Sequence, residues 1–129
     1  MFDRFSAYQP QLLSLLRIVT GLLFISHGTA KVLGFPAMDG LPEPGLSLAG
    51  LSGPLELLFG ALFLIGLFTR PVAFVLSGMM AVAYFMAHAP QNLFPAVNGG
   101  DAAILFCFVF FYLFVAGGGE WSLDAQRRA

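Results

Sequence analysis

The chain has 129 residues, of which 58% are hydrophobic and only 10% are charged, and its formal net charge is -1. Soluble globular domains carry about 25% charged residues, so this composition and a mean hydropathy of +0.84 exclude a water-soluble domain. The chain has no block of basic residues, so it offers nothing for nucleic acid to bind. The single cysteine, Cys107, lies in an apolar run, and we expect it to pack as a small hydrophobic residue.

Four apolar stretches follow one another along the chain, at about 12–35, 48–68, 72–88 and 102–118. A helix of about 20 residues crosses a bilayer, so the first two stretches are long enough and the last two are short. The first stretch contains His27-Gly28 where a cleaved signal peptide would have small residues, so we expect it to be retained. The sequence predicts an all-α fold, with residues 1–129 forming one domain, a polytopic four-helix membrane bundle.

The orientation of the bundle follows from its basic residues. Arginines flank the stretches on one side only, at Arg4, Arg70, Arg127 and Arg128. The positive-inside rule then puts both termini in the cytoplasm and the connections 36–47 and 89–100 outside. Lys31, near the outer end of the first stretch, departs from this pattern, and its long stem could reach outward.

Ionisable residues inside the apolar stretches are the feature most informative about function. A charge at the bilayer centre costs about 2.5 to 3.5 kcal/mol, so these groups should face one another rather than lipid. Arg17, His27 and Lys31 fall on one side of the first helix at 100° per residue. Glu56 shares a face of the second helix with glycines that allow another helix to approach closely. Glu56 and Asp101 can balance Lys31 and Arg17, and we expect at least one ion pair among these four residues.

The predicted topology brings several of these groups to the outer half of the bundle, where they would form one outward-facing polar pocket. The candidate ligand-binding residues are His27, Lys31, Glu56, His88 and Asp101. A second set, Arg17, Arg70 and Asn98, is interpreted as a structural polar network that fixes helix register. Asp101 also has a purely structural interpretation, because a carboxylate at the start of a helix can cap its free N–H groups.

Three ligand chemistries fit such a pocket. A quinone or other redox ligand would take hydrogen bonds from His and Lys, with walls supplied by the 15 Phe and three Tyr. Axial haem ligation by His27 and His88 is disfavoured because nothing in the sequence orients the two rings. A metal site is disfavoured because no ligand spacing typical of zinc is present. The sequence therefore assigns no metal, no catalytic residue and no definite cofactor.

The sequence resembles the DoxX family of small bacterial four-helix membrane proteins. The segments that carry the resemblance run in the same order through nearly the whole chain: Leu16-Arg17-Ile18, Ser26-His27-Gly28 with Lys31, Gly53-Pro54-Leu55-Glu56, Thr69-Arg70, Asn98-Gly99-Gly100-Asp101 and Trp121-Ser122-Leu123-Asp124. Family members often have Glu after the paired glycines, where this chain has Asp101. The shorter side chain keeps the charge.

This resemblance implies a multi-pass protein of the bacterial inner (plasma) membrane with a redox-linked role. Some relatives are membrane subunits of thiosulfate:quinone oxidoreductase or belong to thiol-redox assemblies, so an oxidoreductase subunit is one interpretation. The expected partners are membrane lipid, a redox partner protein and a second copy of the chain. Two other functions stay open: a non-catalytic anchor for a partner protein, and a carrier for a lipid or small molecule. The sequence names neither the substrate nor the electron donor.

Overall fold

The computed structural model describes residues 1–128, which form helices and connecting loops without any strand. These residues divide into two compact units. One unit contains Met1–Phe68 together with the C-terminal residues from Gly118 onward, and the other contains Thr69–Gly117. The all-α fold predicted from the sequence is confirmed.

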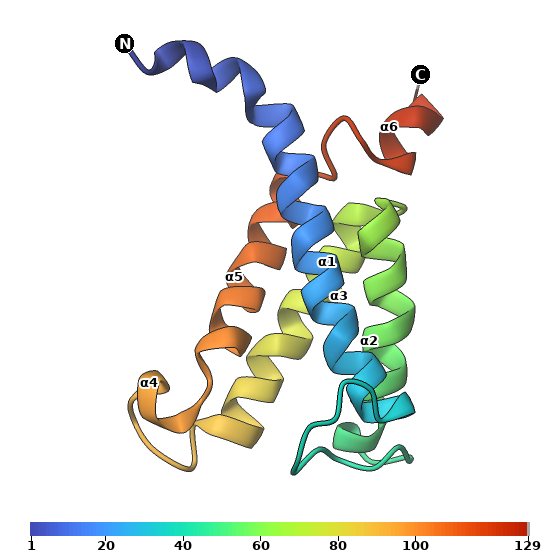
Figure 1. Cartoon of the computed structure of the whole chain (residues 1–129), viewed down its shortest axis with the longest axis vertical. Coiled ribbons are helices and arrows are strands. Elements are labelled where there is room, and N and C mark those ends of the chain that lie inside the picture. The colour runs from blue at the N-terminus through green and yellow to red at the C-terminus, as the bar shows by residue number, and fades with distance from the viewer. Residues whose placement is uncertain (129) are drawn as a thin grey trace. The chain divides into compact units, whose positions relative to one another are not determined.

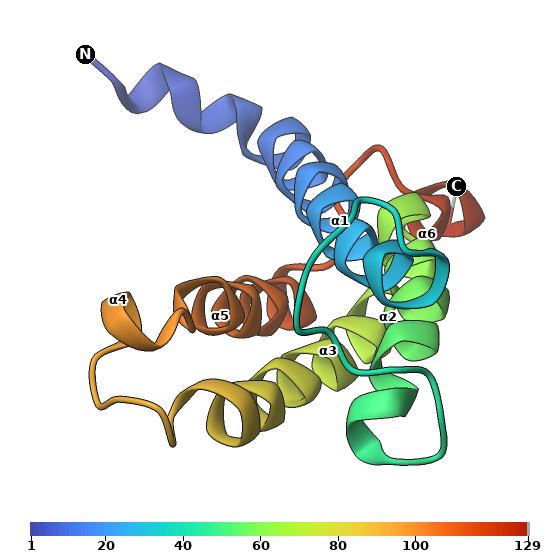
Figure 2. The same ribbon diagram turned by 60° about the horizontal axis from the view of Figure 1, so that its bottom comes forward.

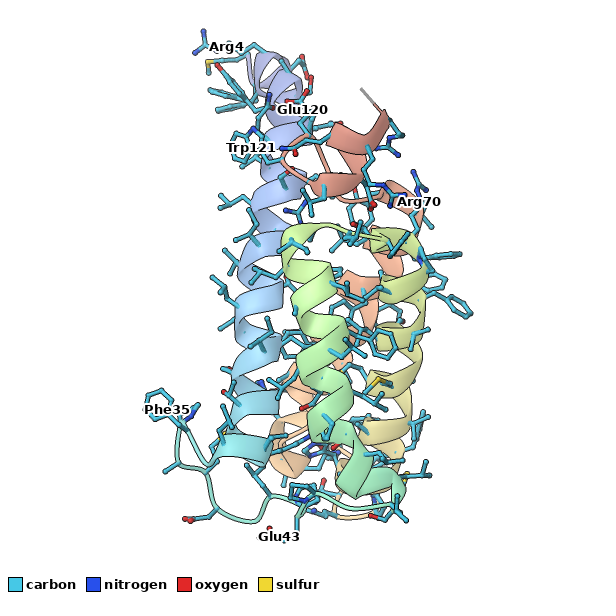
Figure 3. All side chains as sticks on the ribbon, turned by 90° about the vertical axis from the view of Figure 1, so that its right-hand side faces the viewer. Arg4, Phe35, Glu43, Arg70, Glu120 and Trp121 are labelled. Carbon is cyan, nitrogen blue, oxygen red and sulfur yellow. The ribbon has the colours of Figure 1, made fainter. Side chains whose placement is uncertain are left out.

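The first unit is built on two long helices. A short 3₁₀ helix, η1 (Asp3–Tyr8), leads into α1 (Gln9–Leu33), and α2 (Leu48–Ile65) returns antiparallel beside it (Figure 1). The C-terminal helix α6 (Leu123–Arg128) completes the unit. Figure 3 places the connecting loop, with Phe35 and Glu43, at one end of the α1–α2 pair and Trp121 at the other.

The ends of α1 and α2 follow from local sequence. Pro10 lies in the first turn of α1, where its missing N–H costs nothing, and Gly34 ends the helix in the left-handed region with φ of 71°. The Ser47 hydroxyl accepts the N–H of Gly50 at 3.0 Å and caps α2. Gly66, with φ of 73°, ends α2 in the same left-handed conformation.

Glycines bring the α1 and α2 backbones close together along their whole contact. A Cβ atom at Gly21 would lie 3.1 Å from Leu64, and one at Gly60 would lie 2.8 Å from Ile25. Gly28 and Gly53 have equally close neighbours on the facing helix. Because lipid supplies no hydrophobic driving force between helices, close backbone packing of this kind stabilises the pair.

The second unit also consists of an antiparallel pair of helices with a short connection. Helix α3 (Thr69–Ala83) continues as a π-helical turn, η2 (Tyr84–His88), and α5 (Asp101–Ala116) lies beside α3 (Figure 2). Between them is a single turn of helix, α4 (Pro95–Asn98). The Ser77 hydroxyl donates to the Cys107 carbonyl at 2.8 Å and links the two long helices.

Three segments are long and apolar enough to cross a membrane: Asp3–Leu33, Leu48–Ile65 and Thr69–His88. The fourth, Asp101–Ala116, is a shorter apolar helix of 16 residues. At 1.5 Å per residue it spans about 24 Å, less than the hydrocarbon core of about 30 Å. These helices make the chain a membrane protein. The predicted span limits remain predictions, and the short helices η1, α4 and α6 were not predicted.

The glycine contacts lead to a test of the α1–α2 packing. Gly53→Ala puts a methyl group 2.9 Å from the Cβ atom of Lys31, which cannot move without its helix, so we expect a loss of about 1 to 3 kcal/mol in stability. Gly78→Ala is the matched control, because nothing lies within 4 Å of that position, and its stability should change by less than about 1 kcal/mol. Thermal unfolding in detergent measures both variants. Equal stabilities would contradict the close packing.

Candidate functional site

An ion pair between Lys31 on α1 and Glu56 on α2 is the centre of the candidate site. The Lys31 ammonium lies 2.8 Å from Glu56 Oε1 and also donates to the Ser52 hydroxyl at 3.1 Å. The Glu56 side chain is 3% exposed and that of Lys31 is 16% exposed. The ion pair expected from the sequence is therefore present, with its carboxylate buried and its ammonium at the edge.

The helix packing positions this pair. Glycines lie next to both charged residues: a Cβ atom at Gly28 would lie 3.1 Å from that of Glu56, and one at Gly53 would lie 2.9 Å from that of Lys31. Lys31 is in the last turn of α1, where a cation interacts favourably with the helix dipole. Lys31 is therefore near the loop end of α1, whereas Glu56, the ninth of the 18 residues of α2, is midway along its helix.

The second carboxylate oxygen of Glu56 takes no part in the ion pair. Glu56 Oε2 is buried and has no hydrogen-bond partner among the residues that the structure describes. A buried polar atom without a partner typically costs about 1 to 3 kcal/mol, and more when it is charged. The carboxylate therefore retains one acceptor that the described residues leave unused.

His27 is the third predicted site residue in this unit. Its Nδ1 atom lies 2.9 Å from the Leu23 carbonyl oxygen, which can only accept, so Nδ1 carries the proton. Nε2 is then the acceptor of the neutral ring. His27 lies one turn before Lys31 on α1 and next to Gly28, whose neighbour on α2 is Glu56.

Arg17 serves a different purpose from these three residues. Its side chain is only 1% exposed, and the guanidinium donates to two backbone carbonyls of the C-terminal segment, those of Gly118 and Trp121. Ser14, one turn earlier on α1, accepts the N–H of Trp121 at 3.0 Å. Arg17 therefore fastens the C-terminal segment to α1, a structural role at the opposite end of the unit from Lys31.

The second unit contains the other predicted residues. His88 Nδ1 lies 3.1 Å from the Asn98 carbonyl oxygen, and the Asn98 amide donates to the Tyr84 hydroxyl at 3.2 Å and to the Asn92 carbonyl at 3.0 Å. The Tyr84 and His88 rings stack within the π-helical turn. Asn98 is 5% exposed and makes hydrogen bonds to all the other members of this cluster, His88, Tyr84 and Asn92.

Asp101 and Arg70 lie at the two ends of α5. Asp101 is exposed in the first turn, and the residue at the cap position is Gly100, whose N–H is accepted by Asn98 Oδ1 at 2.8 Å. The Asp101 side chain therefore does not cap α5. Its carboxylate lies in the first turn, where a negative charge interacts favourably with the helix dipole. Arg70 donates to the Phe114 and Val115 carbonyls and so satisfies the C-terminal end of α5.

Two members of these clusters were missed from the sequence. Ser52 precedes Glu56 by one helical turn, so its position on the same face could have been recognised, but a single serine is too common to be informative. Tyr84 offered no signal, because its place depends on the π-helical turn. Among residues 1–128 no group of three or more His, Cys, Asp and Glu side chains is placed to hold a metal ion.

Comparison with known proteins gives the family. The DoxX family model matches residues 12–89, which is more than half of the chain. The chain belongs to the DoxX family. The match covers Arg17, His27, Lys31, Glu56 and His88 and ends before Asp101.

The chain is also similar to an uncharacterized protein of Haemophilus influenzae. The two are 42% identical over 125 residues, and the match covers 91% of each chain. No solved structure matches the chain. Membership of the DoxX family agrees with the apolar helices described above, and both identify a membrane protein.

The Lys31–Glu56 contact can be tested with a double-mutant cycle in this DoxX protein. Lys31→Met leaves Glu56 Oε1 without its donor, and Glu56→Gln replaces the charged acceptor of Lys31 with a neutral one. Each variant should lower stability by about 1 to 3 kcal/mol, and the double variant should lose less than the sum. Lys31→Met combined with Glu43→Gln, in the exposed loop, is the additive control. Strict additivity in the first cycle would contradict a direct pair.

Proposed function

We propose that this protein is the membrane component of a redox-linked pathway and binds a quinone or a small reduced sulfur compound beside Lys31 and Glu56. The observation that carries the proposal is the ion pair with one unsatisfied carboxylate oxygen. Charged groups in membrane helices are rare, and those that are retained commonly mark ligand or proton pathways. In this proposal Oε2 is the acceptor that the ligand uses.

The position of the pair supports this function. Lys31 is in the last turn of α1 and Ser52 is in the second turn of α2, so the ammonium is toward one end of these helices, while the Glu56 carboxylate is midway along α2. A ligand dissolved in the bilayer, or one arriving from the aqueous side, could approach it there. His27, one turn before Lys31 on α1, adds a ring nitrogen that can hydrogen-bond a ligand.

The proposed cellular setting follows the charge pattern. We place the protein in the bacterial inner membrane with both termini in the cytoplasm, because Arg4, Arg70, Arg127 and Arg128 would then face inward. The Lys31–Glu56 site is in that case on the outer side. The redox partner is a separate protein that supplies or removes electrons, and it would contact this side of the membrane.

The test is to identify what the protein carries. Native mass spectrometry after gentle extraction, with fragmentation of the ejected molecules, should find a quinone or defined redox metabolite on the wild-type protein. Glu56→Ala should abolish its retention because the carboxylate is removed, and Glu43→Ala, in the exposed loop, should leave it unchanged. A chain carrying only bulk lipid or a partner protein would instead identify a non-catalytic anchor.

A further inference from the structure

The hydrogen-bonding groups at the Lys31–Glu56 pair specify more than the presence of a ligand. An ammonium has three N–H donors, and Lys31 uses two of them, toward Glu56 Oε1 and the Ser52 hydroxyl. The Ser52 hydroxyl donates its own hydrogen bond to the Ala49 carbonyl at 2.7 Å, so it can only accept from Lys31. What remains is one N–H of Lys31 and the buried acceptor Glu56 Oε2.

We infer that this site binds the hydroxyl form of its ligand, a hydroquinone, in preference to the carbonyl form, a quinone. The inference rests on the proposed function and specifies the ligand. A ring hydroxyl both donates and accepts, so one O–H group can donate to Glu56 Oε2 while its oxygen accepts from Lys31. A carbonyl oxygen can only accept, and it would leave Oε2 unsatisfied and face it with a second partial negative charge.

The exposure of the two side chains indicates how the ligand arrives. Lys31 is at the edge of the site and Glu56 lies behind it, with side chains 16% and 3% exposed. A long, unbranched lysine stem has many rotamers and can swing aside, whereas Glu56 is held against Gly28 of the facing helix. The ligand therefore enters past Lys31 and ends with its hydroxyl against Oε2.

Selective binding of the reduced form has a redox consequence. Each tenfold preference for the hydroquinone raises the midpoint potential of the bound two-electron couple by about 30 mV relative to the unbound couple. The site would thus make the bound quinone a stronger oxidant. A partner protein that delivers electrons from a reduced compound would then reduce the bound quinone more readily than unbound quinone.

The experiment compares three probes with the whole protein in nanodiscs under anaerobic conditions: decyl-ubiquinol, decyl-ubiquinone and the dimethyl ether of decyl-ubiquinol. The ether keeps the reduced aromatic ring but has no hydroxyl proton. The wild-type protein should bind the quinol at least about tenfold more tightly than either of the other probes, since a hydrogen bond to a charged group contributes about that much.

Glu56→Gln tests the role of the oxygen itself. Lys31 needs an acceptor, so the amide oxygen should take the place of Oε1, and the NH₂ group should take the place of Oε2. That group donates equally well to a hydroxyl or a carbonyl oxygen, so the preference for quinol should disappear. Glu43→Gln makes the same chemical change in the exposed loop and should keep the preference.

The outcomes separate this inference from the function on which it rests. Equal affinity of the wild-type protein for quinol and quinone, or binding of the ether as tight as that of the quinol, overturns the inference and leaves the proposed function standing. Failure of all three probes to bind overturns the inference and the quinone as the ligand of the proposed function, and native mass spectrometry then tests the reduced sulfur compound. The wild-type comparison decides the question even where Glu56→Gln fails to insert.

Discussion

A carboxylate buried between two membrane helices is the constraint on which this structure depends. Glu56 can exist there only because Lys31 reaches it from the facing helix at 2.8 Å, and Lys31 can reach it only because glycines on both helices let the backbones approach. The same close packing buries Glu56 Oε2 without giving it a donor among the described residues. Packing, charge and the unsatisfied oxygen are thus consequences of a single contact surface.

The other buried charge of this unit is stabilised in a different way. The Arg17 guanidinium donates to the backbone carbonyls of Gly118 and Trp121, whereas Lys31 donates to a carboxylate. Backbone carbonyls are acceptors that any sequence can provide, so this arrangement holds the C-terminal segment without specifying a ligand. The contrast separates the two ends of the first unit, with a structural charge at one and the candidate binding group at the other.

The fold was predictable from the sequence because its signal is long and repetitive. Apolar stretches the length of a bilayer identified the helices α1, α2, α3 with η2, and α5, and the spacing of the glycines around Glu56 was enough to indicate close packing. The short helices were not predicted because single turns such as Pro95–Asn98 are too short to have a hydrophobic periodicity. Their positions depend on contacts distant in sequence.

The candidate site was predictable in part. Spacing placed His27 and Lys31 on one face, and the charges favoured at least one ion pair, but the sequence could not show that Lys31 and Glu56 would form it or which oxygen of Glu56 would lack a partner. Nor could it show that Arg17 would bind carbonyls, because a loop carbonyl has no sequence signature. Asn98 was assigned to the structural network from the sequence, whereas its partner Tyr84 depends on a π-helical turn that sequence patterns do not reveal.

Infrared difference spectroscopy of the Glu56 carboxylate is the most direct measurement of the central claim, that one oxygen of a buried ion pair is reserved for a ligand. The spectrum of hydroquinone-loaded minus unloaded protein should contain a shift of the carboxylate stretching bands, and that shift should be absent in Glu56→Gln. Carboxylate bands that stay unchanged while the ligand binds would contradict the account, because they would mean that the ligand lies elsewhere and that Glu56 only holds the two helices together.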